Sequence, residues 1–219
     1  MTTGQRLNTI YQLLTDRFGP QHWWPGETQF EIIVGAILTQ NTNWGNVEKA
    51  IANLKAADAL SPNRLHVLHR DRLAELIRPA GYFNVKAARL TSFLDWLFVR
   101  YQGDLARVEG RGTSSLREEL LAVKGIGPET ADSILLYAFN RPVFVVDAYT
   151  ARVAARHSLI EPPFDYPQLQ EVFQSNLPQE VSLFNEFHAL LVRVGKEYCK
   201  PRPRCEGCPL EDLPHNVEP

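Results

Sequence analysis

Hydrophobic positions recur along most of this chain at the three- and four-residue spacing of amphipathic helices. Leu7, Ile10 and Leu14, for example, fall on one face of the first segment, as in a helix that packs one side against a core. The spacing predicts helices over residues 5–18, 30–38, 45–57, 70–78, 86–101, 148–157, 167–175 and 183–197. Residues 142–146 are apolar enough for a strand, but an isolated strand without a partner is implausible. We interpret this run as a buried connector and predict an all-α protein.

A second pattern, between residues 116 and 138, predicts two helices joined by a tight turn. The turn is Gly125-Ile126-Gly127, where glycine permits backbone conformations that a Cβ forbids. Pro128 suits the first turn of the helix that follows. Exposed amide groups in such a turn can bind a phosphate oxygen. A single glycine hairpin is also common in proteins that do not bind nucleic acid.

Asp147 stands about twenty residues after Gly127, between the apolar connector and the next predicted helix. Alone, an aspartate at such a place is most often a helix N-cap. The hairpin and the aspartate together, at this spacing, resemble the HhH-GPD superfamily of DNA repair glycosylases, which includes endonuclease III. The resemblance implies two lobes: a helical barrel over residues 22–135 that ends in the helix-hairpin-helix, and a second lobe of residues 1–21 and 136–219.

The resemblance also implies roles for single residues. A glycosylase extrudes the damaged base from the duplex, so it needs a grip on the backbone, a plug for the gap and a carboxylate at the sugar. We expect the grip from Lys124, Gly125 and Gly127, the plug from Gln40 and Tyr82, and the carboxylate from Asp147. That carboxylate would stabilise the oxocarbenium ion of the sugar and orient the attacking water.

The residue before Thr130 separates the branches of this superfamily. Bifunctional members have a lysine there, which attacks the sugar and cuts the strand, whereas this chain has Glu129, which cannot form an imine. The segments around the paired tryptophans and around Gln40 look most like the 3-methyladenine glycosylase branch. By that resemblance the base pocket is lined by Trp23, Trp24, Pro25 and Trp44, with Glu129 at the substrate. Indole faces suit the positive charge of an alkylated purine, although paired tryptophans are also common core residues.

Three functions stay open on these residues. The first is a monofunctional glycosylase that removes alkylated purines. The second is a bifunctional glycosylase and lyase that acts on oxidised pyrimidines. The third is a non-catalytic module that binds damaged DNA, and Asp147 argues against it because mere binding needs no carboxylate at the sugar.

All three cysteines of the chain, Cys199, Cys205 and Cys208, lie near its end. In a cytosolic protein such clustering favours a metal over a disulfide. The spacing resembles the iron–sulfur loop of endonuclease III, but the first gap is one residue shorter, and Pro214 and His215 stand where the fourth cysteine is expected. A labile [4Fe-4S] cluster and a metal-free loop both stay open. The chemistry of base removal itself requires no cofactor.

The overall charge adds little to this picture. The formal net charge is -2, and the pI is about 6.3, so a grip on phosphate has to be local. No apolar run approaches the roughly 20 residues of a membrane helix, and the first residues lack the apolar core of a signal peptide. We expect a monomer in a bacterial or archaeal cytosol, with double-stranded DNA that contains damaged bases as its partner.

Overall fold

The computed structural model describes residues 1–217, and within this range the chain is helical without a strand. The all-α prediction is therefore confirmed. The chain divides into two compact units. We call Pro25–Arg141 the central unit, and Met1–Trp24 together with the chain from Pro142 the terminal unit. None of the described helices is long and apolar enough to span a membrane.

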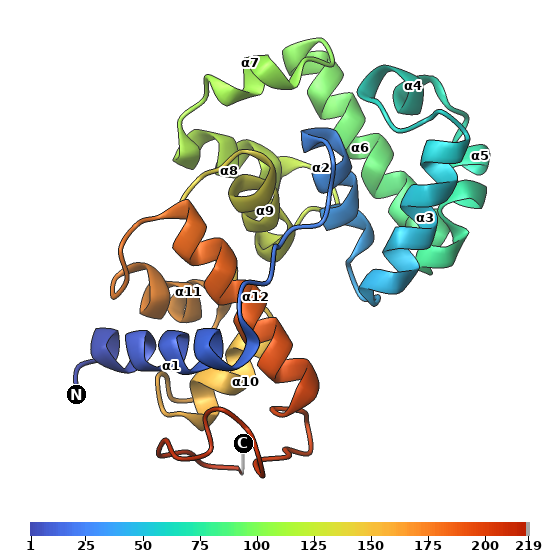
Figure 1. Ribbon diagram of the computed structural model, residues 1–219. Helices are drawn as coiled ribbons and strands as arrows, with labels where there is room; N and C mark the ends of the chain where they lie inside the picture. The colour runs from blue at the N-terminus through green and yellow to red at the C-terminus, as the bar shows by residue number, and fades with distance from the viewer. Residues whose placement is uncertain (218–219) are drawn as a thin grey trace. The chain divides into compact units, whose positions relative to one another are not determined.

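The central unit is built around one buried helix, α2 (Gln29–Leu38), which packs on α3, α6, α9 and η2 (Figure 1). Most residues of α2 are buried, as expected for a helix that is apolar on all sides. The other elements of this unit are α3 (Trp44–Ala56), α4 (Pro62–Val67), α5 (Arg70–Leu76), the 3-10 turn η1 (Arg78–Ala80), α6 (Phe83–Tyr101), α7 (Leu105–Glu109), α8 (Thr113–Ala122), α9 (Pro128–Ser133) and the π-helical turn η2 (Ile134–Ala138).

The terminal unit combines the first helix of the chain with its last three. Its helices are α1 (Thr3–Phe18), α10 (Ala148–Arg156), α11 (Tyr166–Gln174) and α12 (Val181–Glu197). The last of these packs on both α10 and α1, and its Phe187 ring lies 5.2 Å from the ring of Tyr11 on α1. The core is aromatic, with the rings of Phe144 and Phe173 stacked 4.3 Å apart.

The apolar run before Asp147 is a buried connector without strand structure, as predicted. Its backbone groups find side-chain partners instead of a neighbouring strand. The amide of Phe144 donates to Gln174 Oε1 over 2.9 Å, and Gln170 Nε2 donates to the Phe144 carbonyl over 2.7 Å. These two glutamines on α11 satisfy groups that would otherwise be buried without hydrogen bonds.

The sequence pattern misses two short helices, α4 and α7. Each begins at a capping side chain: Ser61 accepts a hydrogen bond from the Arg64 amide before α4, and Asp104 accepts one from Ala106 before α7. Pro62 also stands in the first turn of α4, where its missing N–H costs nothing. Neither helix is long enough to show a hydrophobic period.

Candidate functional site

The predicted hairpin lies between α8 and α9 in the central unit. It buries Ile126 and exposes Lys124, Gly125 and Gly127. The Ile126 amide donates to the Val123 carbonyl over 3.1 Å, which closes the turn. The backbone of Gly125 has a φ of +92°, in the region that favours glycine. The predicted phosphate-binding residues therefore share one exposed turn.

Gln40, the predicted plug residue, is attached to this hairpin. Its Nε2 donates to the Gly125 carbonyl over 3.0 Å and to Thr130 Oγ1 over 2.9 Å. Its Oε1 accepts a hydrogen bond from Arg89 Nη1 on α6. A Cβ on Gly125 would lie 2.4 Å from Arg89 Cγ, so the arginine stem packs directly on the glycine. Arg89 was not expected from the sequence, and only the packing of α6 on the hairpin reveals it.

The second predicted plug residue, Tyr82, is 71% exposed at the start of α6. Its φ of +45° is a left-handed conformation that is uncommon outside glycine. Behind it, the buried Nζ of Lys86 donates to the Ala80 carbonyl over 2.7 Å. Burial, with a smaller contribution from Arg89, lowers the pKa of Lys86 to about 8. An interior ammonium therefore supports the turn that presents this tyrosine.

Trp44, at the start of α3, lines an open pocket of the central unit. Its Nε1 donates to Glu48 Oε1 over 2.7 Å. Among the other residues of the pocket are Pro25, Glu27, Glu31 and Lys55. The Lys55 ammonium lies 3.0 Å from the carboxylates of both Glu27 and Glu31. Three carboxylates, of Glu27, Glu31 and Glu48, and the single ammonium of Lys55 leave this pocket with a net negative formal charge.

The paired tryptophans lie outside regular structure, as expected. They belong to the terminal unit, whereas the resemblance to the superfamily predicts the lobe of residues 22–135 for them. Trp23 and Trp24 are both half-buried, and their rings meet edge to face with centroids 5.3 Å apart. The structure thus brings Pro25 and Trp44 together in one pocket and the two neighbouring indoles together in a separate contact.

Glu129 lies exposed in the first turn of α9. A carboxylate is favoured there by the positive end of the helix dipole. The helix itself is fastened to α8 by Arg117, whose guanidinium donates to both oxygens of the buried Asp132 over 2.7 and 3.0 Å. A bidentate pair of this kind fixes both distance and orientation, so the hairpin is held from both of its helices.

Asp147 is the N-cap of α10 in the terminal unit. Its Oδ1 accepts hydrogen bonds from the Thr150 amide over 2.8 Å and from Thr150 Oγ1 over 3.0 Å. Its Oδ2 lies 3.6 Å from Nε2 of His188, on α12. Burial by itself would raise the pKa of Asp147, but the His188 and Thr150 interactions outweigh it and hold that pKa below its usual value. The side chain is therefore a carboxylate throughout the neutral range.

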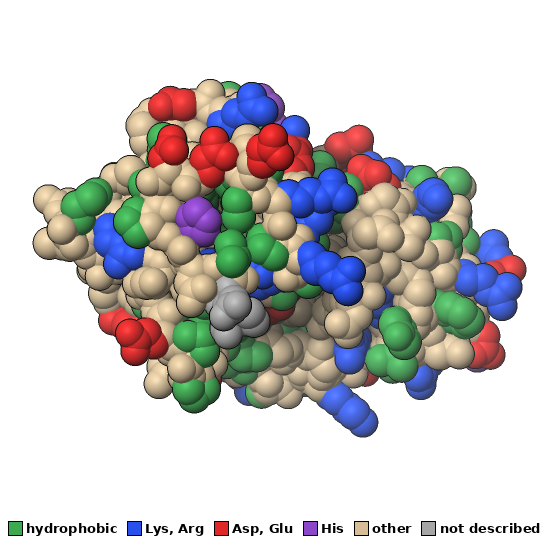
Figure 2. Space-filling view, turned by 90° about the horizontal axis from the view of Figure 1, so that it is seen from below, with side chains coloured by type: hydrophobic (Ala, Val, Ile, Leu, Met, Phe, Trp, Pro, Cys, Tyr) green, Lys and Arg blue, Asp and Glu red, His purple; other side chains and the backbone are tan. Residues whose placement is uncertain are grey.

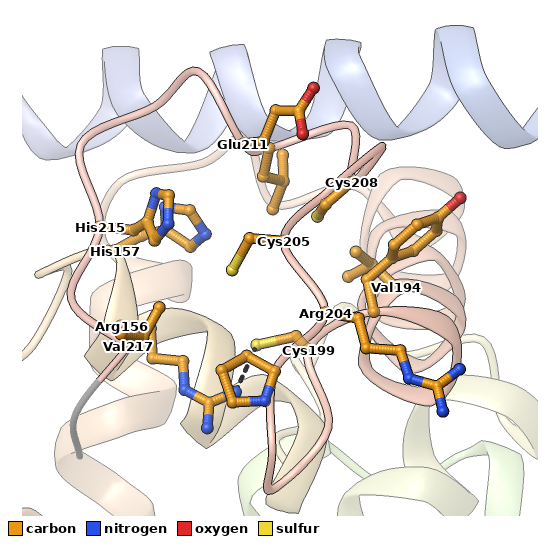
Figure 3. A pocket seen from close by; sticks show the side chains of 13 residues that line it. Arg156, His157, Val194, Cys199, Arg204, Cys205, Cys208, Glu211, His215 and Val217 are labelled. Carbon is orange, nitrogen blue, oxygen red and sulfur yellow. Dashed lines mark hydrogen bonds between the residues drawn. The ribbon is translucent and has the colours of Figure 1, made fainter.

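The three cysteines line one pocket of the terminal unit, together with His157 and His215 (Figure 3). Cys199 is buried, and its sulfur accepts a hydrogen bond from Arg156 Nη1 over 3.2 Å. Within residues 1–217, however, no three His, Cys, Asp or Glu side chains converge as a group that could hold a metal ion. The structure therefore gathers the three predicted cysteines at one pocket without a metal-binding group among the described residues, and no step of the chemistry below uses an iron–sulfur cluster.

Acidic and basic side chains both lie on the face of the molecule that Figure 2 shows. This mixture agrees with the net charge of -2. Lys124 of the hairpin is one of the exposed basic side chains.

Comparisons with known proteins support the resemblance to the HhH-GPD superfamily. Residues 34–179 match the family model described as HhH-GPD superfamily base excision DNA repair protein. The chain is 45% identical over 211 residues to "Putative DNA repair glycosylase MJ1434" of Methanocaldococcus jannaschii, covering 95% of this chain and 96% of that protein. It is 29% identical to endonuclease III of Thermotoga maritima over 84% of this chain and 81% of that protein.

Solved structures show the same fold. The H. pylori 3-methyladenine DNA glycosylase (MagIII) bound to 1,N6-ethenoadenine superposes with a TM-score of 0.77 at 31% identity, covering 90% of this chain and 98% of that chain. A non-covalent complex of endonuclease III with DNA has a TM-score of 0.81 at 21% identity, covering 97% and 95% of the two chains. The chain is a base excision repair DNA glycosylase and belongs to the HhH-GPD superfamily.

Proposed function

We propose that this protein is a monofunctional glycosylase that removes alkylated, positively charged purines of the 3-methyladenine type from double-stranded DNA. The observation that carries the proposal is the pocket of the central unit, where the Trp44 indole stands among three carboxylates. An electron-rich ring and a net negative charge both favour a cationic base over a neutral one. The 31% identity to MagIII, whose name states that activity, supports the same substrate class.

Base removal on this proposal depends on extrusion of the damaged nucleotide from the stack. The exposed hairpin at Lys124 holds a phosphate, while Gln40 and Tyr82 occupy the gap that the base leaves. Asp147 then faces the sugar. Because its Oδ1 already accepts two hydrogen bonds from Thr150, we assign Oδ2 to the developing oxocarbenium ion and to the water that attacks it.

Glu129 makes hydrolysis the outcome. A carboxylate at this position cannot attack the sugar to form an imine, so water adds to the anomeric carbon and the strand stays intact. An alkylated purine is already a good leaving group because of its positive charge, and it needs little help from a general acid. The alternative, a bifunctional enzyme on oxidised pyrimidines, would require an amine that replaces the missing lysine.

The deciding experiment measures release of 3-methyladenine from methylated duplex DNA and then looks for strand breaks without added alkali. We expect release without breaks, and no covalent adduct with DNA after borohydride. The control is Asp147→Asn, which keeps the size and part of the capping of the side chain but removes its charge. Excision should fall about 100-fold or more, as for other preorganised electrostatic groups, while binding persists.

Other outcomes have plain meanings. A borohydride adduct would return the bifunctional lyase to first place. Undiminished excision by Asp147→Asn would reduce Asp147 to a helix cap. Binding to damaged DNA without release of any base would favour the non-catalytic module.

A further inference from the structure

His188 is a polar side chain in the interior of the terminal unit. Its side chain is 6% exposed, and it lies on α12 beside the fully buried Phe184 and Phe187. Burying an imidazole among apolar groups costs free energy unless it is compensated. A leucine at this position would serve packing alone at lower cost. The imidazole therefore requires an explanation beyond packing.

The two oxygens of Asp147 have different surroundings. Thr150 supplies two donors to Oδ1 from the first turn of α10, whereas Oδ2 faces His188 Nε2 at 3.6 Å. A carboxylate held at one oxygen can still rotate about its Cβ–Cγ bond. A second group at the other oxygen, carried by a different helix, limits that rotation.

We propose that His188 is a positioning residue for excision: from α12 it fixes the orientation of the Asp147 carboxylate and secures its negative charge. The inference rests on the proposed role of Asp147 and adds to it the contact that makes this role effective. The packing of α12 on α10 sets the distance between the two side chains. A helix cap needs only Thr150, so the cap alone does not account for the imidazole.

This role has a consequence for the pH dependence of excision. Thr150 from α10 and His188 from α12 both lower the pKa of Asp147, and burial raises it. Another charged residue of α10, Arg152, is bound to the carbonyls of Ala148 and Cys199. Without His188, one of the two groups that offset burial is lost, and the pKa of Asp147 rises. Asp147 is then protonated at a higher pH. In a plot of excision rate against pH, the fall in rate on the acid side (the acid limb of the excision profile) therefore moves to higher pH.

Two amide substitutions separate positioning from packing. In His188→Gln the side-chain amide nitrogen can take the place of imidazole Nε2 and donate to Asp147 Oδ2. In His188→Asn the amide nitrogen falls near the place of Nδ1 and is too short to reach that oxygen. We expect His188→Asn and His188→Leu to lower the single-turnover excision rate by about 100-fold, the scale of a 1 Å misplacement. Affinity for damaged duplex should stay unchanged, and His188→Gln should recover most of the rate.

A packing control comes from α1. Leu14 is fully buried in the same unit, so Leu14→Ala lowers stability without touching Asp147. It should leave the acid limb of the excision profile in place, whereas His188→Asn should move that limb to higher pH. The melting temperature of each variant is measured to check that it folds. If His188→Leu does not fold, His188→Asn still tests the inference.

Two results would overturn the inference. One is wild-type excision by folded His188→Asn or His188→Leu. The other is equal loss in His188→Gln and His188→Asn with an unmoved acid limb, as in Leu14→Ala, which would make His188 a packing residue. Failure of the proposed function is recognised separately, because the wild type would then release no 3-methyladenine or would form a borohydride adduct. Failure of the role of Asp147 is recognised because Asp147→Asn would keep its activity. An inactive Asp147→Asn beside fully active His188 variants would remove the positioning role alone.

Discussion

At the scale of single residues, replacing Trp44 tests whether the substrate is a positively charged base. Trp44→Ala should cost about 1 to 3 kcal/mol of base recognition, the usual range for stacking of a base on an aromatic ring. The loss should be larger for 3-methyladenine than for neutral hypoxanthine, because the charged base gains a cation–π attraction to the indole face in addition to the stacking that both bases share. Excision rates on the two lesions measure this difference.

A matched control for Trp44 lies in the same unit. Trp96 on α6 packs against Phe93 and Tyr101, each with ring centroids 5.3 Å away. Trp96→Ala should lower the melting temperature by several degrees. It should weaken excision of 3-methyladenine and of hypoxanthine equally. If Trp44→Ala behaved in the same way, the indole would be structural, and the alkylpurine assignment would lose its main support.

Lys86 gives the protein a pH dependence of stability with a definite sign. Its pKa falls from 10.5 to about 8 in the folded state. Between these values the unfolded chain binds more protons than the folded one, so stability rises with pH. Relative to Lys86→Met, the free energy of unfolding of the wild type should rise by up to about 3 kcal/mol between pH 8 and 10.5. Denaturant unfolding of both proteins at several pH values measures this gain.

An exposed lysine on α3, Lys49, is the control for this measurement. It keeps its solvation on folding, so Lys49→Met should show no comparable change with pH. A flat difference between wild type and Lys86→Met would contradict the burial of the Lys86 ammonium.

At the scale of elements, the hairpin depends on its two glycines unequally. Gly125→Ala would place a Cβ 2.4 Å from Arg89 Cγ, at a φ of +92°. We expect a loss of about 1 to 3 kcal/mol of stability and weaker binding to any duplex, because Arg89 and Gln40 must move with the turn. Thermal melts and binding to undamaged DNA test both effects.

Gly127 provides the comparison within the same turn. Its φ is −95°, and a Cβ there would meet nothing within 4 Å. The melting temperature of Gly127→Ala should therefore be close to that of the wild type. A large loss of stability in this variant, or none in Gly125→Ala, would mean that the turn is not held by its contact with Arg89.

The sequence pattern was sufficient for the long helices and for the connector, but not for contacts between elements. Hydrophobic spacing locates a helix such as α12, and a glycine turn locates the hairpin. The bonds from Gln40 to the hairpin and to Arg89 depend on how α2 and α6 pack, which no local pattern encodes. His188 was missed for the same reason, because its partner belongs to another helix. Asp147 was visible only because its spacing from the hairpin is a family feature.

At the scale of the whole molecule, the spacing of hydrophobic positions gave a correct fold class, whereas composition and net charge gave almost no information on function. A net charge of -2 would not single out a DNA glycosylase. The proposed function depends on small groups of residues: an exposed turn with Lys124, an acidic pocket at Trp44, and a carboxylate capped by Thr150. Bulk charge averages over these groups and conceals them.

The terminal unit is assembled from both ends of the chain, and this affects the order in which the protein can be made. As the ribosome releases the chain, α1 emerges before the central unit, whereas α12, on which it packs, emerges after it. The central unit is one continuous segment and can fold while synthesis continues. Until α12 arrives, the apolar face of α1 lacks its partner and Asp147 lacks its neighbouring histidine. A nascent chain that stops short of α12 would therefore complete its hairpin while Asp147, the proposed catalytic carboxylate, still lacked the support of His188.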